Sequence, residues 1–284
     1  MIIDTQVYPA LFEVICHDEE AFRLRCDEMN YHLMKPSAPD LLRAQYALAE
    51  LDHVVLLAQD CSAEFGRPFI SNEEIRSIID NEGDGFYIGF ASVDPRVPDA
   101  AERLEQAFTD LDLAGLALSP AKLGMFPSDE RMKALYRVCE RYNKPVMFQA
   151  GLSLETNAIS KYARPVEFEE VAIKHPHIKM CLSQLGWPWV EETAAFLVKL
   201  PNLYANTSVM CMGGPHQLFE KIFRQDYGRW WLDHDLADKI MFGSDSPRIR
   251  PVRSKRGLDA LEMEPETRRK VYGENALRFL GIEG

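Results

Sequence analysis

The sequence has no long apolar run. No window of the 284 residues approaches the roughly 18 consecutive apolar residues that a membrane-spanning helix needs. The opening MIIDTQVYP also lacks a basic segment followed by a long apolar one, which is the pattern of a secretory signal. We therefore expect a protein with no membrane partner and a cytoplasmic location.

Basic residues are scarce as well. The chain has 32 Lys and Arg against 44 Asp and Glu, which gives a formal net charge of −12. A surplus of negative charge disfavours binding to the phosphates of nucleic acids and of anionic lipids. We therefore predict a partner that is neither nucleic acid nor membrane.

Cysteines are few and carry no paired spacing. None stands in a CxxC motif, and a chain of this length has enough core to fold without disulfides. We predict that all six are reduced thiols: Cys16, Cys26, Cys61, Cys139, Cys181 and Cys211.

What the chain does contain is a regular alternation of short apolar runs and amphipathic segments. Such alternation is typical of βα units around a parallel sheet. Eight repeats in this length favour an α/β fold of the (β/α)8 barrel type, one domain over 1–284, rather than an open doubly wound sheet. The predicted strands are 2–8, 53–59, 86–93, 113–119, 145–150, 178–184, 203–209 and 239–245.

The segments between these runs read as helices, with two departures from a regular barrel. Several begin at Ser, Asp or Pro, the residues that cap or start helices. The clearest helices are predicted at 71–80, 98–111, 129–142 and 190–200. The connection 9–52 is a long insertion after the first strand, which we expect to act as a lid or an interface. The segment 213–238 carries paired tryptophans and exceeds one ordinary barrel helix.

The residues that end the strands are the candidates for chemistry, because a parallel barrel forms its active site there. They are mostly amides and hydroxyls, which bind and orient a ligand but do not transfer protons. Only Asp245, Asp60 and Asp4 are carboxyl groups. The full set is Asp4, Gln6, Tyr8, Gln59, Asp60, Ser119, Gln149, Gln184, Asn206, Ser208 and Asp245.

Histidine is missing from these strand ends. His53, His175 and His177 precede strands, and His234 lies in a predicted helix. His17 and His216 follow strands and lie in predicted loops. Each is either a solvated surface side chain, which is usual for a loop histidine, or a functional residue.

In order along almost the whole chain, about 1–281, several stretches carry a resemblance to a known family. The chain resembles the amidohydrolase-related (β/α)8 barrels, the group that includes aminocarboxymuconate semialdehyde decarboxylase and resorcylate decarboxylases. The stretches are MIIDTQVYP, SNEEIRSII, FYIGFASVDPR, KPVMFQAG, HPHIKMCLSQLGWPWVEE, LYANTSV, KIMFGSDSP and YGENALRFLG.

The resemblance implies a divalent metal, often zinc, held by a His-x-His pair, two further histidines and an aspartate. In this chain the pair falls on Gln6 and Tyr8, the other histidines on Gln149 and Gln184, and only Asp245 remains. Carboxamide oxygens are weak ligands for transition metals. We therefore predict no metal site and no zinc or manganese cofactor.

A relocated soft-metal site is the alternative to a barrel without metal. Cys61 and Cys211 follow strands, with Met210 and Met212 beside the second cysteine. These residue types suit core packing equally well.

Without a metal, Asp245 is the candidate general base, because burial would raise its pKa toward neutrality. We expect Gln149 and Gln184 to fix its side chain and to donate to a substrate carbonyl. A structural role for Asp245, as a helix cap or as the partner of Arg248, is the competing interpretation.

Two more residues near the predicted site are candidates for substrate binding. Arg248 heads the basic segment 248–256 and could clamp a substrate carboxylate, or form only surface ion pairs. Trp187 could supply a flat wall for a ring, or pack against another subunit.

Three functions are compatible with this set. The first is a metal-independent hydrolase for a small anionic ring or lactone, which the resemblance supports because metal-independent lactonases occur among its relatives. The second is a decarboxylase or other lyase acting on an unsaturated or aromatic carboxylate. The third is a silent barrel that binds a metabolite or an active partner. The resemblance also implies a homodimer as an assembly to test.

Overall fold

Eight parallel strands in sequential order form the centre of the molecule, as the alternation predicts. The computed structural model describes residues 1–31, 34–208 and 214–282. The strands lie in the order β1 to β8, each hydrogen-bonded to the next. They are β1 (Ile3–Val7), β2 (His53–Leu57), β3 (Tyr87–Ala91), β4 (Gly115–Leu118), β5 (Val146–Phe148), β6 (Met180–Leu182), β7 (Leu203–Asn206) and β8 (Ile240–Met241).

The last strand returns to the first and closes the barrel. The amide N of Thr5 donates to the carbonyl of Phe242 at 3.0 Å, and the amide N of Tyr8 donates to the carbonyl of Ser246 at 2.9 Å. The amide N of Asp245 donates in turn to the carbonyl of Gln6 at 3.1 Å. The predicted (β/α)8 barrel is therefore confirmed, and its closure places Gln6 beside Asp245.

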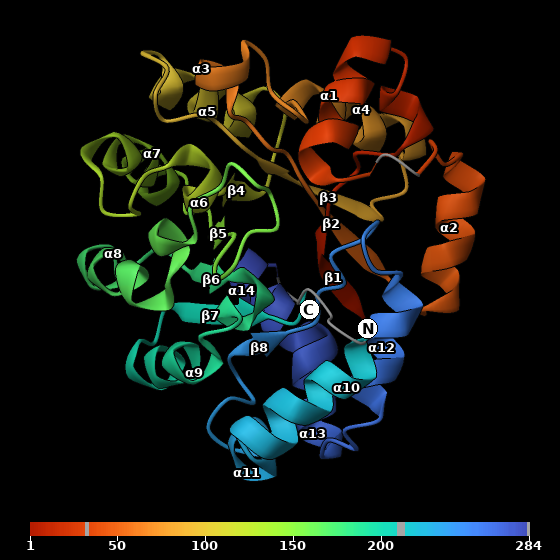
Figure 1. Cartoon of the computed structure of the whole chain (residues 1–284), viewed down its shortest axis with the longest axis vertical. Helices are drawn as coiled ribbons and strands as arrows, with labels where there is room; N and C mark the ends of the chain where they lie inside the picture. The colour runs from red at the N-terminus through yellow and green to blue at the C-terminus, as the bar shows by residue number, and fades with distance from the viewer. Residues whose placement is uncertain (32–33, 209–213, 283–284) are drawn as a thin grey trace.

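Helices surround the strands, as Figure 1 shows. The four clearest predictions correspond to α4, α5, α7 and α9, and Ser71 starts α4 with a capping box to Glu74. The helices are α1 (Glu19–Met29), α2 (Pro39–Leu48), α3 (Ser62–Phe65), α4 (Asn72–Glu82), α5 (Ala100–Thr109), α6 (Pro120–Leu123), α7 (Glu130–Arg141), α8 (Glu169–Lys174), α9 (Val190–Lys199), α10 (Pro215–Glu220), α11 (Arg229–Asp233), α12 (Pro251–Asp259), α13 (Pro265–Arg269) and α14 (Asn275–Leu280).

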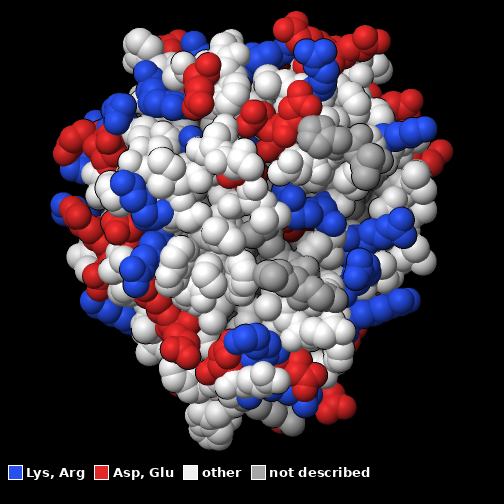
Figure 2. All heavy atoms as spheres, viewed as in Figure 1, with Lys and Arg blue, Asp and Glu red and all other residues white. Residues whose placement is uncertain are grey.

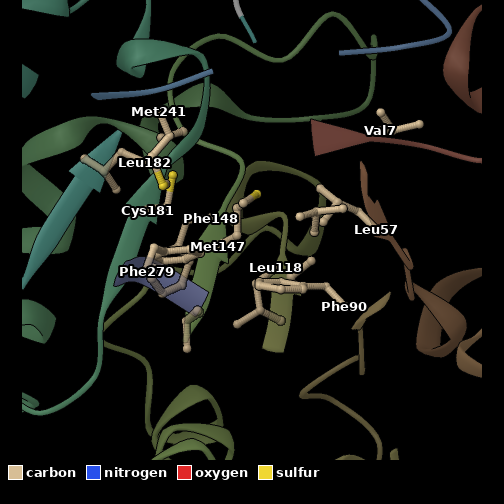
Figure 3. Close-up of a cluster of buried hydrophobic side chains, with 14 of the residues drawn as sticks. Val7, Leu57, Phe90, Leu118, Met147, Phe148, Cys181, Leu182, Met241 and Phe279 are labelled. Carbon is tan, nitrogen blue, oxygen red and sulfur yellow. The ribbon is translucent and has the colours of Figure 1, made fainter. Parts of the chain in front are cut away.

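Apolar side chains fill the interior of the barrel (Figure 3). Phe90 of β3 stacks on Phe279 of α14 with ring centroids 6.2 Å apart, and Phe279 also meets Tyr204 of β7 edge-on at 5.6 Å. Gly115 of β4 makes room for Phe90, because a Cβ there would lie 2.5 Å from the phenyl ring. The amino-terminal end of the barrel is thus packed shut, and open space is left to the other end.

The long connection after β1 contains α1 and α2. An Arg25 side chain buried in α1 donates to the carbonyl of Ile15 at 2.6 Å and to Glu74 of α4 at 3.0 Å. This buried pairing fixes the insertion against the barrel, and the end of α1 reaches the mouth of the barrel through Met29.

No helix within the described ranges is long and apolar enough to cross a membrane. Each of the five cysteines in those ranges is a free thiol, as predicted, while Cys211, Met210 and Met212 lie outside the described residues. Figure 2 shows charged side chains of both signs around the rim of one face, with a mostly uncharged centre.

Candidate functional site

A hollow at the carboxyl ends of the strands brings most of the predicted site residues together. Six of its lining residues were predicted from the sequence, and the others come from the insertion and the loop after β5. The empty space within it, about 320 Å³, includes solvent at its open side, and the enclosed part has room for little more than a water molecule. The lining residues are Tyr8, Met29, Tyr31, Gln59, Gln149, Leu154, Glu155, Gln184, Asp245 and Arg248.

Asp245 lies in the wall of this hollow, held by a hydrogen-bond donor on each carboxylate oxygen. Nε2 of Gln6 donates to Oδ1 at 3.3 Å, and Nε of Arg248 donates to Oδ2 at 3.2 Å. The side chain is almost fully buried, with 3% of its surface exposed. Its φ angle of 62° is in the left-handed region, a strained conformation of the kind that clusters at functional sites.

The groups around Asp245 shift the pKa of its carboxyl in opposite directions. Burial raises the pKa of its carboxyl to about 6, and the charge of Glu155 adds to the rise. The positive charge of Arg248 and the hydrogen bond from Gln6 work in the other direction. The result is a carboxyl group that can accept or release a proton near neutral pH.

The hydrogen bonds to Asp245 differ from the predicted ones. We expected Gln149 and Gln184 to fix this side chain, and neither bonds to it. Gln6 does so instead, because Nδ2 of Asn206 donates to its Oε1 at 3.1 Å and leaves its NH₂ group for the carboxylate. Gln6 is fully buried beneath the hollow rather than in its lining.

Three glutamines around the hollow have side-chain oxygens without partners. Oε1 of Gln59, Gln149 and Gln184 is buried and accepts no hydrogen bond within the described part of the chain. In folded proteins, buried polar atoms nearly always have a hydrogen-bond partner. These oxygens are therefore placed to bind a ligand or water.

A second carboxyl group lies beneath the first. Oδ1 of Asp4 accepts from the amide N of Ser244 at 2.9 Å and of Gln6 at 3.2 Å, while Oδ2 is buried and finds no partner in the described ranges. Burial raises the pKa of Asp4 to about 7, against the lowering effect of its hydrogen bonds. Asp4 is fully buried and does not line the hollow, and the charge of Asp245 adds to the rise of its pKa.

Sequence reasoning missed the ion pair between Lys122 and Glu155. Both are buried, with Nζ of Lys122 3.5 Å from Oε1 of Glu155. Although burial disfavours its charged form, Lys122 and the Ser153 hydroxyl hold the pKa of Glu155 below its ordinary value. The signal in the sequence was a single charge in each of two apolar segments that follow β4 and β5.

Met29 and Tyr31 were also missed. They belong to the insertion and lie far along the chain from Arg248, the residue that they contact. The guanidinium carbon of Arg248 lies 5.4 Å from the centre of the Tyr31 ring, and its NH2 nitrogen donates to the carbonyl of Met29 at 3.5 Å. Part of the insertion thus covers the mouth of the barrel.

Other predicted residues lie apart from the hollow. The carboxylate of Asp60 accepts the amide N–H groups of Ser62 and Asp94 at 2.8 and 3.1 Å, which is a role in loop structure. His17 and His216 are exposed. Trp187 is half-buried against the core and is not in the lining of the hollow, and its backbone carbonyl accepts the amide N of Leu152 at 2.7 Å.

Comparison with known families now adds to this geometry. The amidohydrolase family model matches residues 16–282. The chain belongs to the amidohydrolase family. No curated protein matches the sequence.

Among solved structures, this amidohydrolase is similar to an uncharacterized TIM-barrel protein from Bordetella bronchiseptica. Their identity is 20%, with 99% of this chain and 98% of the other covered, and the TM-score is 0.78. A 5-carboxyvanillate decarboxylase from Sphingomonas paucimobilis has 15% identity, 99% of each chain covered and a TM-score of 0.67. A probable 2-pyrone-4,6-dicarboxylic acid hydrolase from Acinetobacter baumannii has 14% identity, 99% of each chain covered and a TM-score of 0.65. At these identities the likeness establishes the fold.

The donor set of this amidohydrolase fits a divalent transition metal poorly. At the positions that the resemblance assigns to histidine ligands stand two glutamines with neutral amide oxygens, a third that is engaged with Asn206, and a phenol. Burial raises the pKa of Tyr8 well above its ordinary value, so its oxygen keeps a proton. Both oxygens of Asp245 already accept hydrogen bonds, one of them from the cation Arg248.

Cys61 is an equally poor ligand. Burial raises the pKa of its thiol to about 12, and metals bind the thiolate. Its prospective partner Cys211 lies outside the described residues.

Proposed function

We propose that this amidohydrolase-family chain is a hydrolase that opens a small lactone or other anionic ring without a metal ion, with Asp245 as its general base. The observation that carries the proposal is the environment of that carboxyl. It is buried, held on both oxygens, and its pKa is raised to about 6. A base with a pKa near the working pH is the most effective at taking a proton from water.

In the proposed reaction Asp245 removes a proton from a water molecule as the water oxygen attacks the ring carbonyl. The new C–O bond forms while the carbonyl π bond breaks, which leaves a negative charge on the former carbonyl oxygen. That tetrahedral intermediate collapses, the bond to the ring oxygen breaks, and Asp245 returns the proton to this leaving oxygen. The product is the ring-opened hydroxy acid, and the enzyme is regenerated.

The charge on the intermediate needs hydrogen-bond donors in place of a cation. The Tyr8 phenol remains protonated, since burial raises its pKa well above the ordinary value. Gln149 and Gln184 offer amide groups that face the hollow. Amide oxygen and nitrogen are exchanged by a flip of the side chain, so each glutamine can present NH₂ to the oxyanion.

Arg248 is the proposed partner of a substrate carboxylate. It is partly exposed, with 24% of its side-chain surface accessible, and it has two further nitrogens beyond the one that binds Asp245, of which Nη2 donates weakly to the carbonyl of Met29. A planar guanidinium suits two-point binding of a carboxylate. Trp187 does not line the hollow and stays a prediction as a ring contact.

Decarboxylation is the second candidate, and the same carboxyl group favours it. An acid with a pKa of about 6 keeps a protonated fraction near neutrality and can deliver a proton to a ring carbon as the C–C bond to carbon dioxide breaks. Similar solved structures include the 5-carboxyvanillate decarboxylase and a 2,6-dihydroxybenzoate decarboxylase. We place it second because hydrolysis uses the unprotonated form, which predominates above pH 6.

The pH dependence of the rate separates the two reactions. Purified protein, dialysed against chelator, is assayed on a panel of pyrone carboxylates, other lactones and hydroxybenzoates. For hydrolysis we expect kcat/KM to rise with pH through about 6 to a plateau, because the base must be unprotonated. A proton-donating acid gives the opposite slope.

Asp245→Asn tests the role of the residue itself. We expect kcat to fall about 10³-fold with the fold retained, in line with the loss of a general base. Asp238→Asn is the matched control, because Asp238 is an exposed partner of Arg278 and Lys270 just before β8. Equal loss in both variants, activity that returns only when zinc or manganese is added, or no turnover of any substrate would each count against the proposal, the last in favour of a silent barrel.

A further inference from the structure

The ion pair of Lys122 and Glu155 lies at the edge of the hollow and has no part in the reaction proposed above. Lys122 belongs to α6, which follows β4, and Glu155 belongs to the loop between β5 and the 3-10 helix Ser160–Ala163. Glu155 faces the hollow, and the charges of both Lys122 and Arg248 act on it. The carboxylate of Glu155 therefore lies in the field of two cations.

The ammonium group of Lys122 is buried with few polar partners. Its residue exposure is 9%, and Nζ has no hydrogen-bond partner within the described residues. The nearest charge is Oε1 of Glu155 at 3.5 Å, and the ring of Phe69 lies 4.7 Å from Nζ. A buried cation in this state binds an anion strongly, since water does not compete for it.

The loop that carries Glu155 is fixed at its two ends. At one end the amide N of Leu152 donates to the carbonyl of Trp187 at 2.7 Å, and at the other that of Ile159 donates to the carbonyl of Ala121 at 3.0 Å. Between them, Asn157 reaches Glu28 of α1 at 3.2 Å, and Leu154 is 46% exposed. Within the loop, the Ser153 hydroxyl donates to the carboxylate of Glu155 and the amide N of Ala158 donates to its carbonyl, so the contacts that hold the tip are polar.

We propose that Glu155 is an internal carboxylate that occupies an anion subsite made by Lys122, and that a carboxylate of the substrate takes its place when the loop 152–159 opens. This inference rests on the proposed function for the chemistry of the ligand, a small ring with a carboxylate. Glu155 then sets specificity by competition: a neutral ring does not displace it. Lys122 anchors the substrate, Arg248 adds its charge, and Asp245 is left free to act as the base.

Binding of benzoate and of its neutral counterpart benzamide, measured by titration calorimetry, tests the exchange without turnover. In Glu155→Gln we expect benzoate to bind about 10-fold more tightly than in the native chain, because the internal competitor has lost its charge. Benzamide should show no such gain. The double variant Lys122→Met with Glu155→Gln replaces the pair by neutral groups and should lose the gain.

Each outcome decides the inference. Unchanged or weaker benzoate binding in Glu155→Gln overturns the role of Glu155, and a gain that persists in the double variant overturns the role of Lys122. An equal gain for benzamide overturns recognition of charge. If Glu155→Gln fails to fold, Glu155→Asp, which withdraws the carboxylate by one carbon, is expected to give a smaller gain in the same direction.

Failure here and failure of the proposed function remain distinguishable. The expected benzoate pattern in a protein that turns over no lactone leaves the anion subsite standing and removes the hydrolase. Lactone hydrolysis that depends on Asp245, without the benzoate pattern, does the reverse.

Discussion

Buried amide side chains at the amino-terminal end of the barrel and those that line the hollow at its mouth are in opposite states. At the amino-terminal end, Nδ2 of Asn202 donates to the carbonyls of Ala172, His175 and Ile178 at 3.0 to 3.2 Å. At the mouth, Oε1 of Gln59 and of Gln184 is buried and has no partner among the residues that the structure describes.

Asn275 repeats the pattern of the amino-terminal end. Its Nδ2 donates to the carbonyls of Ala237 and Ile240 at 2.8 and 2.6 Å, and its Oδ1 accepts from Arg278. These asparagines close loops and stabilise the fold, whereas the unpaired glutamine oxygens cost stability. The difference teaches that residue type alone does not tell a structural amide from a ligand-binding one, and that its unused hydrogen-bonding capacity does.

The largest expected effect concerns the carboxyl groups at the mouth. Since folding raises the pKa of Asp4 from 3.8 to about 7, the folded state favours its protonated form. Its stabilisation is complete below pH 4 and is lost as the pH rises through 7. At about 1.4 kcal/mol per pKa unit, we expect the contribution of Asp4 to the free energy of unfolding to fall by up to about 4 kcal/mol between pH 4 and 8, measured by urea titration as the difference between the native chain and Asp4→Asn.

Asp4→Asn should remove most of this fall and leave the smaller part that Asp245 contributes below about pH 6. Asp94→Asn is the control, because the contribution of Asp94 to the free energy of unfolding changes with pH in the opposite direction. Despite its burial, Arg96 and backbone N–H groups hold the pKa of Asp94 below the ordinary value, so its stabilisation is lost on acidification. A difference in unfolding free energy between the native chain and Asp4→Asn that stays constant from pH 4 to 8 would contradict the assignment to Asp4.

The next effect tests the structural amides. Asn275→Leu leaves two buried carbonyls without their donor, and we expect it to lower the free energy of unfolding by about 2 kcal/mol. Enzymatic activity should be unchanged at temperatures where the variant is folded. Denaturant unfolding and a steady-state assay on the same sample measure both. If the free energy of unfolding falls by less than about 0.5 kcal/mol, Asn275 is not a stabilising amide and the contrast with the mouth of the barrel is wrong.

The smallest expected change in stability is at the mouth. The side chain of Gln149 makes no hydrogen bond within the described residues, and its Oε1 is already unpaired. Gln149→Met keeps the volume and removes the amide, so the free energy of unfolding should change by less than about 0.5 kcal/mol. Turnover should fall about 10-fold or more, because an oxyanion donor is lost. Destabilisation with full turnover would make Gln149 a structural amide instead.

The fold was largely readable from the sequence, because strand and helix patterns are local. The eight apolar runs lie on β1 to β8, and Ser71 begins α4 where its capping sequence indicates. The strand-end rule also brought Tyr8, Gln149 and Asp245 to one hollow, since parallel strands share an edge.

The side-chain contacts inside the site were harder to predict from the sequence. Gln6 rather than Gln149 or Gln184 holds Asp245, because closure of the barrel sets β1 beside the segment that follows β8. This contact depends on closure between segments about 240 residues apart, which leaves no pattern in the sequence.

By itself the sequence determined the barrel, the replacement of the expected histidines by Gln6, Tyr8, Gln149 and Gln184, and Asp245 as the carboxyl group at a strand end. Only the tertiary structure decided that Arg248 faces Asp245 and that Lys122 meets Glu155 at the edge of the same hollow. Secondary structure follows from the spacing of apolar residues over a few turns. Burial and charge pairing follow from which distant segments share a volume, and it is those that set the pKa of Asp245 and the room left for a substrate.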